Sequence, residues 1–161
     1  MTKTSKFWIA FAVGAALSFT NLIAPLHELG HLRTAIEYND EAKITSWSTT
    51  RAEIRLSQAY AGYFFEIWIM ILLGILVLPV KWLPGGFVGY AQFTWFRAFG
   101  STDFNSYVER VIEYYNLNDV NAQHIRSAVV QGWIVRGVIL FGIVWTIMYF
   151  VLRKKREISP A

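Results

Sequence analysis

The sequence predicts a mainly α-helical, polytopic membrane protein with three to four membrane-embedded helices and a small β-like hairpin after the first. Hydrophobic residues make up 55% of the 161 residues and charged residues only 16%, whereas soluble domains usually carry about a quarter charged residues. The apolar residues fall in long runs that almost lack charge. The basic cluster Arg153–Arg156 directly follows the last run, a position typical of a membrane flank.

This composition limits the classes of function that the protein can have. The length allows one domain, so we expect residues 1–161 to form a single membrane-embedded domain, integral and multi-pass. A net charge of +4 also occurs in nucleic-acid-binding proteins, but a basic cluster beside an apolar run indicates the lipid bilayer as partner and no nucleic acid. The absence of cysteine excludes a disulfide framework, a thiolate metal site and a cysteine nucleophile.

Three apolar runs predict membrane spans, each near the roughly 20 residues that cross the hydrocarbon core. The runs cover about 7–31, 59–80 and 127–152. The first has no charge from Phe7 to Leu26, and the second has Glu66 as its only charge. The third reaches spanning length only if it extends back past Arg136, whose charged end we expect to reach the lipid head groups.

Three shorter elements connect these spans. The aromatic segment 87–100 is interrupted by Gln92 and Arg97 and is short for a crossing, which predicts a thin or re-entrant segment. Alternation at 44–47 and 53–56 predicts the two strands of the hairpin. Apolar residues at helical spacing predict an amphipathic helix over 103–115, following Ser101 as a plausible cap.

The chemistry-bearing motif is His27-Glu28-Leu29-Gly30-His31, at the end of the first apolar run. In this H-E-x-x-H arrangement on a helix, two histidines four residues apart share one face and can bind one zinc ion. Glu28 lies about 100° around the helix from His27, where it can act as general base toward a zinc-bound water. We expect Pro25 to kink the same helix and admit water.

The string from Asn21 to His31 resembles the site-2 protease family of intramembrane zinc metalloproteases. The β-like segment after it and Ala61-Gly62 at the start of the next span support the resemblance. It implies a peptide-bond hydrolase whose substrates are membrane proteins or peptides with membrane-spanning or membrane-adjacent segments. It also implies that the third zinc ligand is an aspartate on a later membrane-associated helix.

Asp103 is the candidate for that aspartate. The family usually presents it in a Leu-Asp-Gly context, which this chain lacks; the nearest equivalent runs from Gly100 to Asn105, where an apolar segment ends and a helix begins. Asp103 at a helix start is also explained as a helix cap or an acid stabilised by the helix dipole. Alternative third ligands are Glu66, Asp119 and His124.

The predicted function is therefore an intramembrane zinc endopeptidase with His27, His31 and Asp103 as metal ligands and Glu28 as catalytic residue. The alternative is a non-catalytic accessory membrane subunit or adaptor that keeps a protease-like fold. A third hypothesis is an ion or proton pathway through Glu66, His27 and Arg136. A protein partner or a second copy of the chain is a further candidate partner. For Asp103 to reach the histidines, segment 87–100 must return the chain across or deep into the membrane, which places both basic ends on one face. The positive-inside rule makes that face cytoplasmic, the family resemblance implies the reverse, and the orientation stays open.

Overall fold

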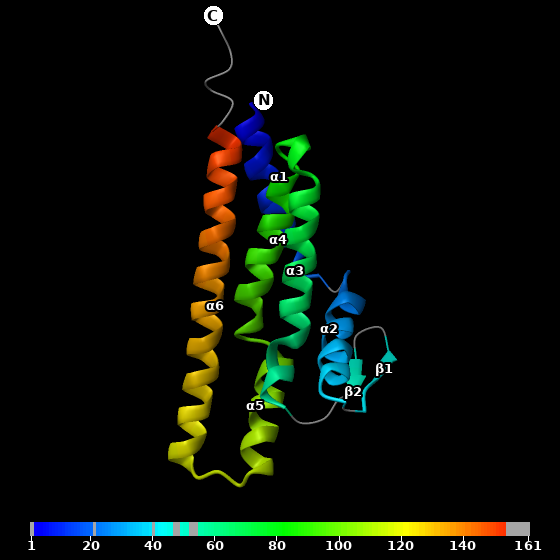
Figure 1. Cartoon of the computed structure of the whole chain (residues 1–161), viewed down its shortest axis with the longest axis vertical. Coiled ribbons are helices and arrows are strands. Elements are labelled where there is room, and N and C mark those ends of the chain that lie inside the picture. The colour runs from blue at the N-terminus through cyan, green and yellow to red at the C-terminus, as the bar shows by residue number, and fades with distance from the viewer. Residues whose placement is uncertain (1, 21, 40, 47–48, 52–54, 154–161) are drawn as a thin grey trace, which may run out of the picture.

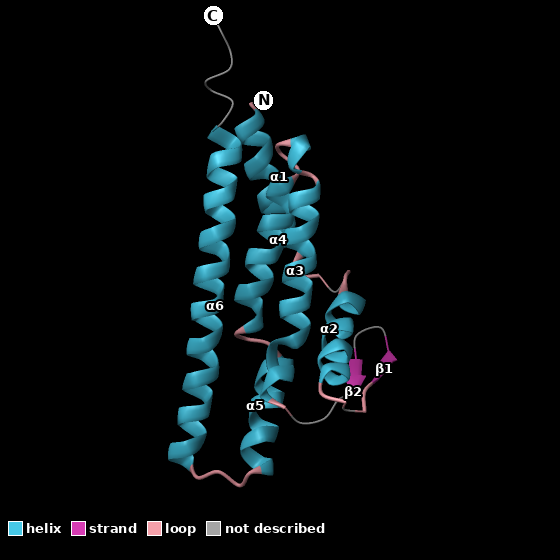
Figure 2. Ribbon diagram, in the orientation of Figure 1, coloured by secondary structure: helices cyan, strands magenta, loops and turns pink. Residues whose placement is uncertain are grey.

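The computed structural model describes residues 2–20, 22–39, 41–46, 49–51 and 55–153. Within this part the chain is mainly helical, and most helices run along one long axis with a small hairpin at the side (Figures 1 and 2). The helices and strands are α1 (Lys3–Leu17), α2 (Ala24–Glu37), β1 (Lys43–Ser46), β2 (Thr49–Arg51), η1 (Leu56–Tyr60), α3 (Ala61–Leu76), η2 (Leu78–Val80), α4 (Pro84–Ala98), α5 (Thr102–Tyr114) and α6 (Asp119–Arg153).

The expected first span, about 7–31, is two helices and not one. The hydroxyl of Ser18 donates to the carbonyl of Ala15 at 2.7 Å, and that of Thr20 donates to the carbonyl of Leu17 at 2.7 Å. Such local bonds compete with the helical ladder and favour a helix end. Pro25 then lies in the first turn of α2, where its missing N–H costs little, so it starts a helix and does not kink one.

The hairpin forms, but its second strand lies earlier than expected. β1 pairs antiparallel with β2, with Lys43 opposite Arg51. The expected strand at 53–56 is wrong at its end, because Leu56 begins η1; positions 53 and 54 lie outside the described residues. Leu56 is drawn instead into an apolar cluster with Ala59 and Phe104, so packing against α5 overrides the local alternation.

In the described part of the chain, two helices are long and apolar enough to cross a membrane, in place of the expected three to four. These are Leu56–Leu76, which joins η1 to α3, and Asp119–Val151 within α6. Helices α1 and α4 have 15 residues each, or about 22 Å at 1.5 Å per residue, against a hydrocarbon core of about 30 Å.

The main core lies where α1, α3, α4 and α6 meet, and it includes Phe7, Ile67, Val88 and Trp133. Helices α1 and α4 approach so closely that a Cβ at Gly89 would meet the carbonyl oxygen of Phe11. Small residues permit such contacts between apolar helices, whose association depends on packing. This contact holds α4, and therefore the start of α5, beside the α1–α2 connection.

Helix α5 begins where the hydroxyl of Ser101 accepts a hydrogen bond from the backbone N–H of Phe104, the cap that the sequence suggests. Its apolar face buries Phe104, Tyr107 and Val108 in a second cluster. The helix therefore lies with its N-terminus next to α2 and α3 (Figure 1). Asp103 stands in its first turn.

Candidate metal centre

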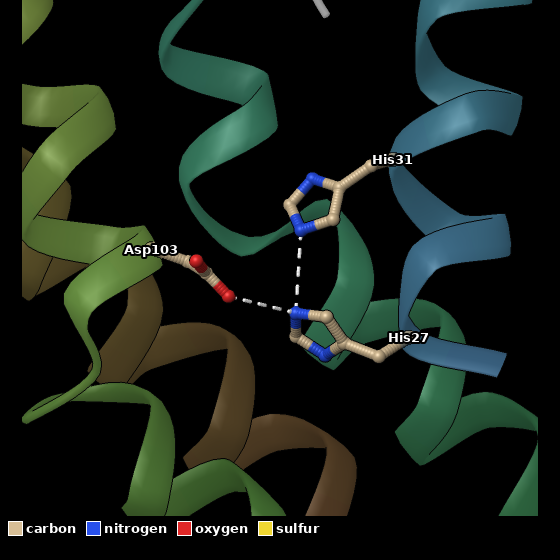
Figure 3. A group of neighbouring side chains, drawn as sticks. All are labelled: His27, His31 and Asp103. Carbon is tan, nitrogen blue, oxygen red and sulfur yellow. Dashed lines mark hydrogen bonds and ion pairs between the residues drawn. The ribbon is translucent and has the colours of Figure 1, made fainter. Parts of the chain in front are cut away.

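The histidines of the H-E-x-x-H motif lie on one face of α2, one turn apart. His27 and His31 are both buried, and their Nε2 atoms are 3.2 Å apart. Figure 3 shows the two rings with these nitrogens turned toward each other. The four-residue spacing in a helix produces this convergence.

Asp103 reaches the same point from α5. Its Oδ2 lies 3.2 Å from Nε2 of His27, and Figure 3 shows the carboxylate facing the pair of rings. One ligand atom from each of the three residues lies within 4.8 Å of the other two.

The other ring nitrogens have partners of their own. Nδ1 of His27 lies 3.3 Å from Oε2 of Glu66, and Nδ1 of His31 lies 3.1 Å from Oε1 of Gln58. The amide of Gln58 also donates to the backbone carbonyl of His31 at 3.2 Å. Partners of this kind fix the tautomer and orientation of metal-binding histidines, and here they leave both Nε2 atoms facing the centre.

Glu66, an alternative third ligand in the sequence, stands behind His27 rather than beside Asp103. It is only 1% exposed. Tyr90 donates its hydroxyl to Glu66 Oε1 at 2.5 Å, and Arg97 donates to both carboxylate oxygens at 3.3 Å. Arg97 also donates to the carbonyl of Ser18, which joins this network to the break between α1 and α2.

Two of the three separations between the candidate ligand atoms match the spacing around one small ion. Zinc–nitrogen bonds of about 2.0–2.1 Å at tetrahedral angles place ligand atoms about 3.3 Å apart. Both separations measured from Nε2 of His27 are 3.2 Å. Two neutral nitrogens and a carboxylate are a ligand set that zinc accepts, with one position left for water or substrate.

A cavity of about 300 Å³ opens beside these side chains. His27, Glu28, Glu66, Arg97 and Asp103 all contribute to its wall. Glu28 is buried, 5% exposed, and thus lines the space next to the candidate ligands without belonging to the ligand group. That is the position that the motif predicts for a general base.

Helix α3 comes close to α2 at Gly62, where a Cβ would collide with the imidazole ring of His27. The glycine of the pair Ala61-Gly62, at the start of α3, is therefore explained by sterics, because a larger residue would collide with His27. Sequence reasoning missed Gln58 as the partner of His31; its one signal is an uncharged polar residue directly before an apolar run.

The remaining alternatives for the third ligand lie elsewhere. Asp119 and His124 are both exposed in the first turns of α6, which begins at the lower end of the bundle, on the side opposite α2 (Figure 1). Neither belongs to the group of described residues that could hold a metal ion.

No family model, no curated protein and no solved structure matches the chain. The geometry around His27 is therefore the basis for the function proposed next.

Proposed function

We propose that this protein is an intramembrane zinc-dependent endopeptidase similar to the site-2 proteases, acting on membrane-spanning or membrane-adjacent peptide segments. One observation carries the proposal. Nε2 of His27, Nε2 of His31 and Oδ2 of Asp103 converge with separations that suit a single zinc ion, while the Nδ1 atoms of both histidines are held from behind.

The candidate ligands, Glu28 and Glu66 have different roles in the proposed reaction. A zinc ion held by the three residues would supply a water of lowered pKa and polarise a peptide carbonyl. The carboxylate of Glu28 takes the proton of the attacking water and gives it to the departing amine nitrogen. Glu66 keeps the ring of His27 turned toward the centre.

The surface of α6 supports placement in a membrane. Only 22% of its most apolar window is buried inside the protein, so this helix differs from the buried core helix of a soluble protein. Its large exposed apolar side chains include Val138, Ile139, Ile143, Ile147, Phe150 and Val151. We propose that α6 and Leu56–Leu76 cross the bilayer, and that α1 with α2 and α4 with α5 complete the multi-pass domain as shorter, broken passes.

Zinc content of the purified chain tests the proposal. After purification without chelators we expect about one zinc per chain, and Asp103→Ala should lose most of it because one of three protein ligands is gone. Asp119→Ala is the matched control and should keep the zinc. A wild-type chain without zinc, or an Asp103→Ala variant that retains it fully, would overturn the site.

Glu28→Gln separates metal binding from catalysis. We expect this variant to keep its zinc and to lose hydrolysis of a membrane-spanning reporter peptide in reconstituted vesicles, because the amide cannot accept the proton. Normal cleavage by Glu28→Gln would refute its role as base. A zinc-loaded wild type that cleaves no member of a diverse set of such peptides favours the accessory-subunit alternative.

A further inference from the structure

A second cavity lies next to α2 and shares no lining residue with the cavity at the candidate metal centre. It has a volume of about 360 Å³ and lies between α2, η1, α3 and α6. Gly30 separates it from the histidines, because here α2 approaches the carbonyl of Ala61 so closely that a Cβ at Gly30 would lie 2.6 Å from that oxygen. The residues that decide its chemistry are Arg33, Glu37, Tyr38, Tyr60, Trp68 and Arg136.

The charge in this cavity is unbalanced. Arg136 stacks over the ring of Tyr60, with its guanidinium carbon 5.0 Å from the ring centre, and no carboxylate of the described residues forms an ion pair with it. Arg33 bonds through Nε to Glu37 at 2.9 Å. Two guanidinium groups, both on exposed side chains, therefore line the cavity with one carboxylate, and this excess of positive charge suits an anionic ligand.

The position of Arg136 indicates where that anion comes from. Arg136 stands directly before the uncharged stretch of α6, and Tyr60 directly precedes α3. Their stacking places the start of α3 and the start of the uncharged stretch of α6 at one level. Tyrosine, tryptophan and arginine at such a level are typical of the membrane interface, where the phosphates of lipids lie.

Apolar surface continues from the cavity along both spans. On α3, Trp68 lines the cavity and Leu72, one turn further, is exposed. On α6, Ile139 and Ile143 follow Arg136 at helical spacing and are also exposed. An occupant with a phosphate at the arginines and hydrocarbon along these faces matches both kinds of surface.

We propose that this cavity binds the phosphate group of an anionic membrane lipid, whose acyl chains lie along α3 and α6. Arginine forms bidentate, charge-assisted bonds with phosphate, and Arg136 and Arg33 are the residues that make them. A lipid bound there connects α2, which carries His27 and His31, to α6. The site is independent of zinc chemistry and requires only that α3 and α6 lie in a membrane.

Native mass spectrometry of the detergent-solubilised full chain tests this site with equimolar phosphatidylglycerol and phosphatidylcholine. We expect phosphatidylglycerol to be retained preferentially. Arg136→Gln and Arg33→Gln should each lower that preference about fivefold to tenfold, the effect of losing a charge-assisted contact. Arg136→Lys should recover part of it. Arg126→Gln is the matched control on α6, because Arg126 pairs with Glu109 outside the cavity, and it should leave the preference unchanged.

Three results would overturn the assignment. Equal retention of both lipids by the wild type, or the same preference in Arg136→Gln as in the wild type, would show that the arginines select no headgroup. Loss of lipid on adding excess inorganic phosphate would show a site for a free anion. Zinc content, measured on the same samples, should be equal in Arg136→Gln and the wild type, so a failure of this site is distinguishable from a failure of the metal centre.

Discussion

His27 makes contacts through both of its ring nitrogens at the candidate metal centre. Its Nε2 faces His31 and Asp103, while its Nδ1 faces Glu66. Without metal, a proton on Nε2 donates to Asp103; a metal ion replaces that proton, because a histidine must present a lone pair to bind it. The same short separations therefore suit both a protonated network and a metal centre.

Glu66→Gln tests the role of Glu66 behind His27. The amide keeps the size of the side chain but removes the charge that Nδ1 of His27, Arg97 and Tyr90 all contact. Loss of a partner of this kind typically weakens metal affinity 10–100-fold, so we expect the zinc Kd to rise by about that factor in competition with a chelating indicator. Glu109→Gln, at an exposed ion pair, should leave the Kd unchanged. A zinc stoichiometry near zero would indicate instead that Glu66 is itself a ligand.

Gly62→Ala tests the close approach of α3 to the site. The added methyl group would overlap the ring of His27, so we expect zinc affinity at least tenfold weaker while the protein remains helical by circular dichroism. Gly74→Ala on the same helix is the control, since a Cβ there would lie 3.4 Å from that of Phe87, an ordinary contact. Equal zinc affinity in the two variants would contradict the close packing of Gly62 against the ring of His27.

At the scale of elements, the break between α1 and α2 decides where the histidines lie. The hydroxyls of Ser18 and Thr20 bond to carbonyls of the last turn of α1, and Arg97 donates to the carbonyl of Ser18. Helix α2 can then set its own direction and place its histidine face toward α3 and α5. An unbroken helix would have fixed that face relative to α1 by the helical repeat alone.

The contact between α1 and α4 should be sensitive to a single methyl group. Gly89→Ala places a Cβ against the carbonyl oxygen of Phe11, and overpacking of this kind costs about 1–3 kcal/mol. We therefore expect a lower thermal midpoint in detergent. Gly142→Ala, on α6 where a Cβ would meet nothing within 4 Å, should match or exceed the wild type, because alanine favours helix. The reverse order of midpoints would contradict the α1–α4 contact.

At the scale of the whole molecule, α6 extends along the bundle from α5 at one end to α1 at the other, and the N-terminus lies beside the far end of α6 (Figure 1). If α6 crosses a bilayer, the start of α1 and the start of α6 lie on opposite faces. The candidate metal centre lies between them, near the level at which α3 begins.

Cysteine labelling tests this arrangement, since the chain has no cysteine of its own. We expect Lys3→Cys and Gln123→Cys, both exposed, to react with a membrane-impermeant maleimide from opposite faces of oriented vesicles. Ile69→Cys, half-buried in the middle of α3, should react from neither face and serves as the control. Reaction of Lys3→Cys and Gln123→Cys from the same face would show that α6 does not cross.

Features that depend on neighbouring residues along the chain can be predicted from the sequence alone. The four-residue spacing put His27 and His31 on one helical face, and Ser101 capped α5, because helical repeat and capping act within a few residues. Features that depend on contacts between residues far apart in the sequence are visible only in the tertiary structure. Glu66 became the support of His27, Gln58 that of His31, and the first apolar run became two helices held at the break by Arg97. A hydrophobic run indicates the length and burial of a helix, but it does not indicate which polar groups of different helices contact each other. Those contacts between helices position the candidate metal ligands.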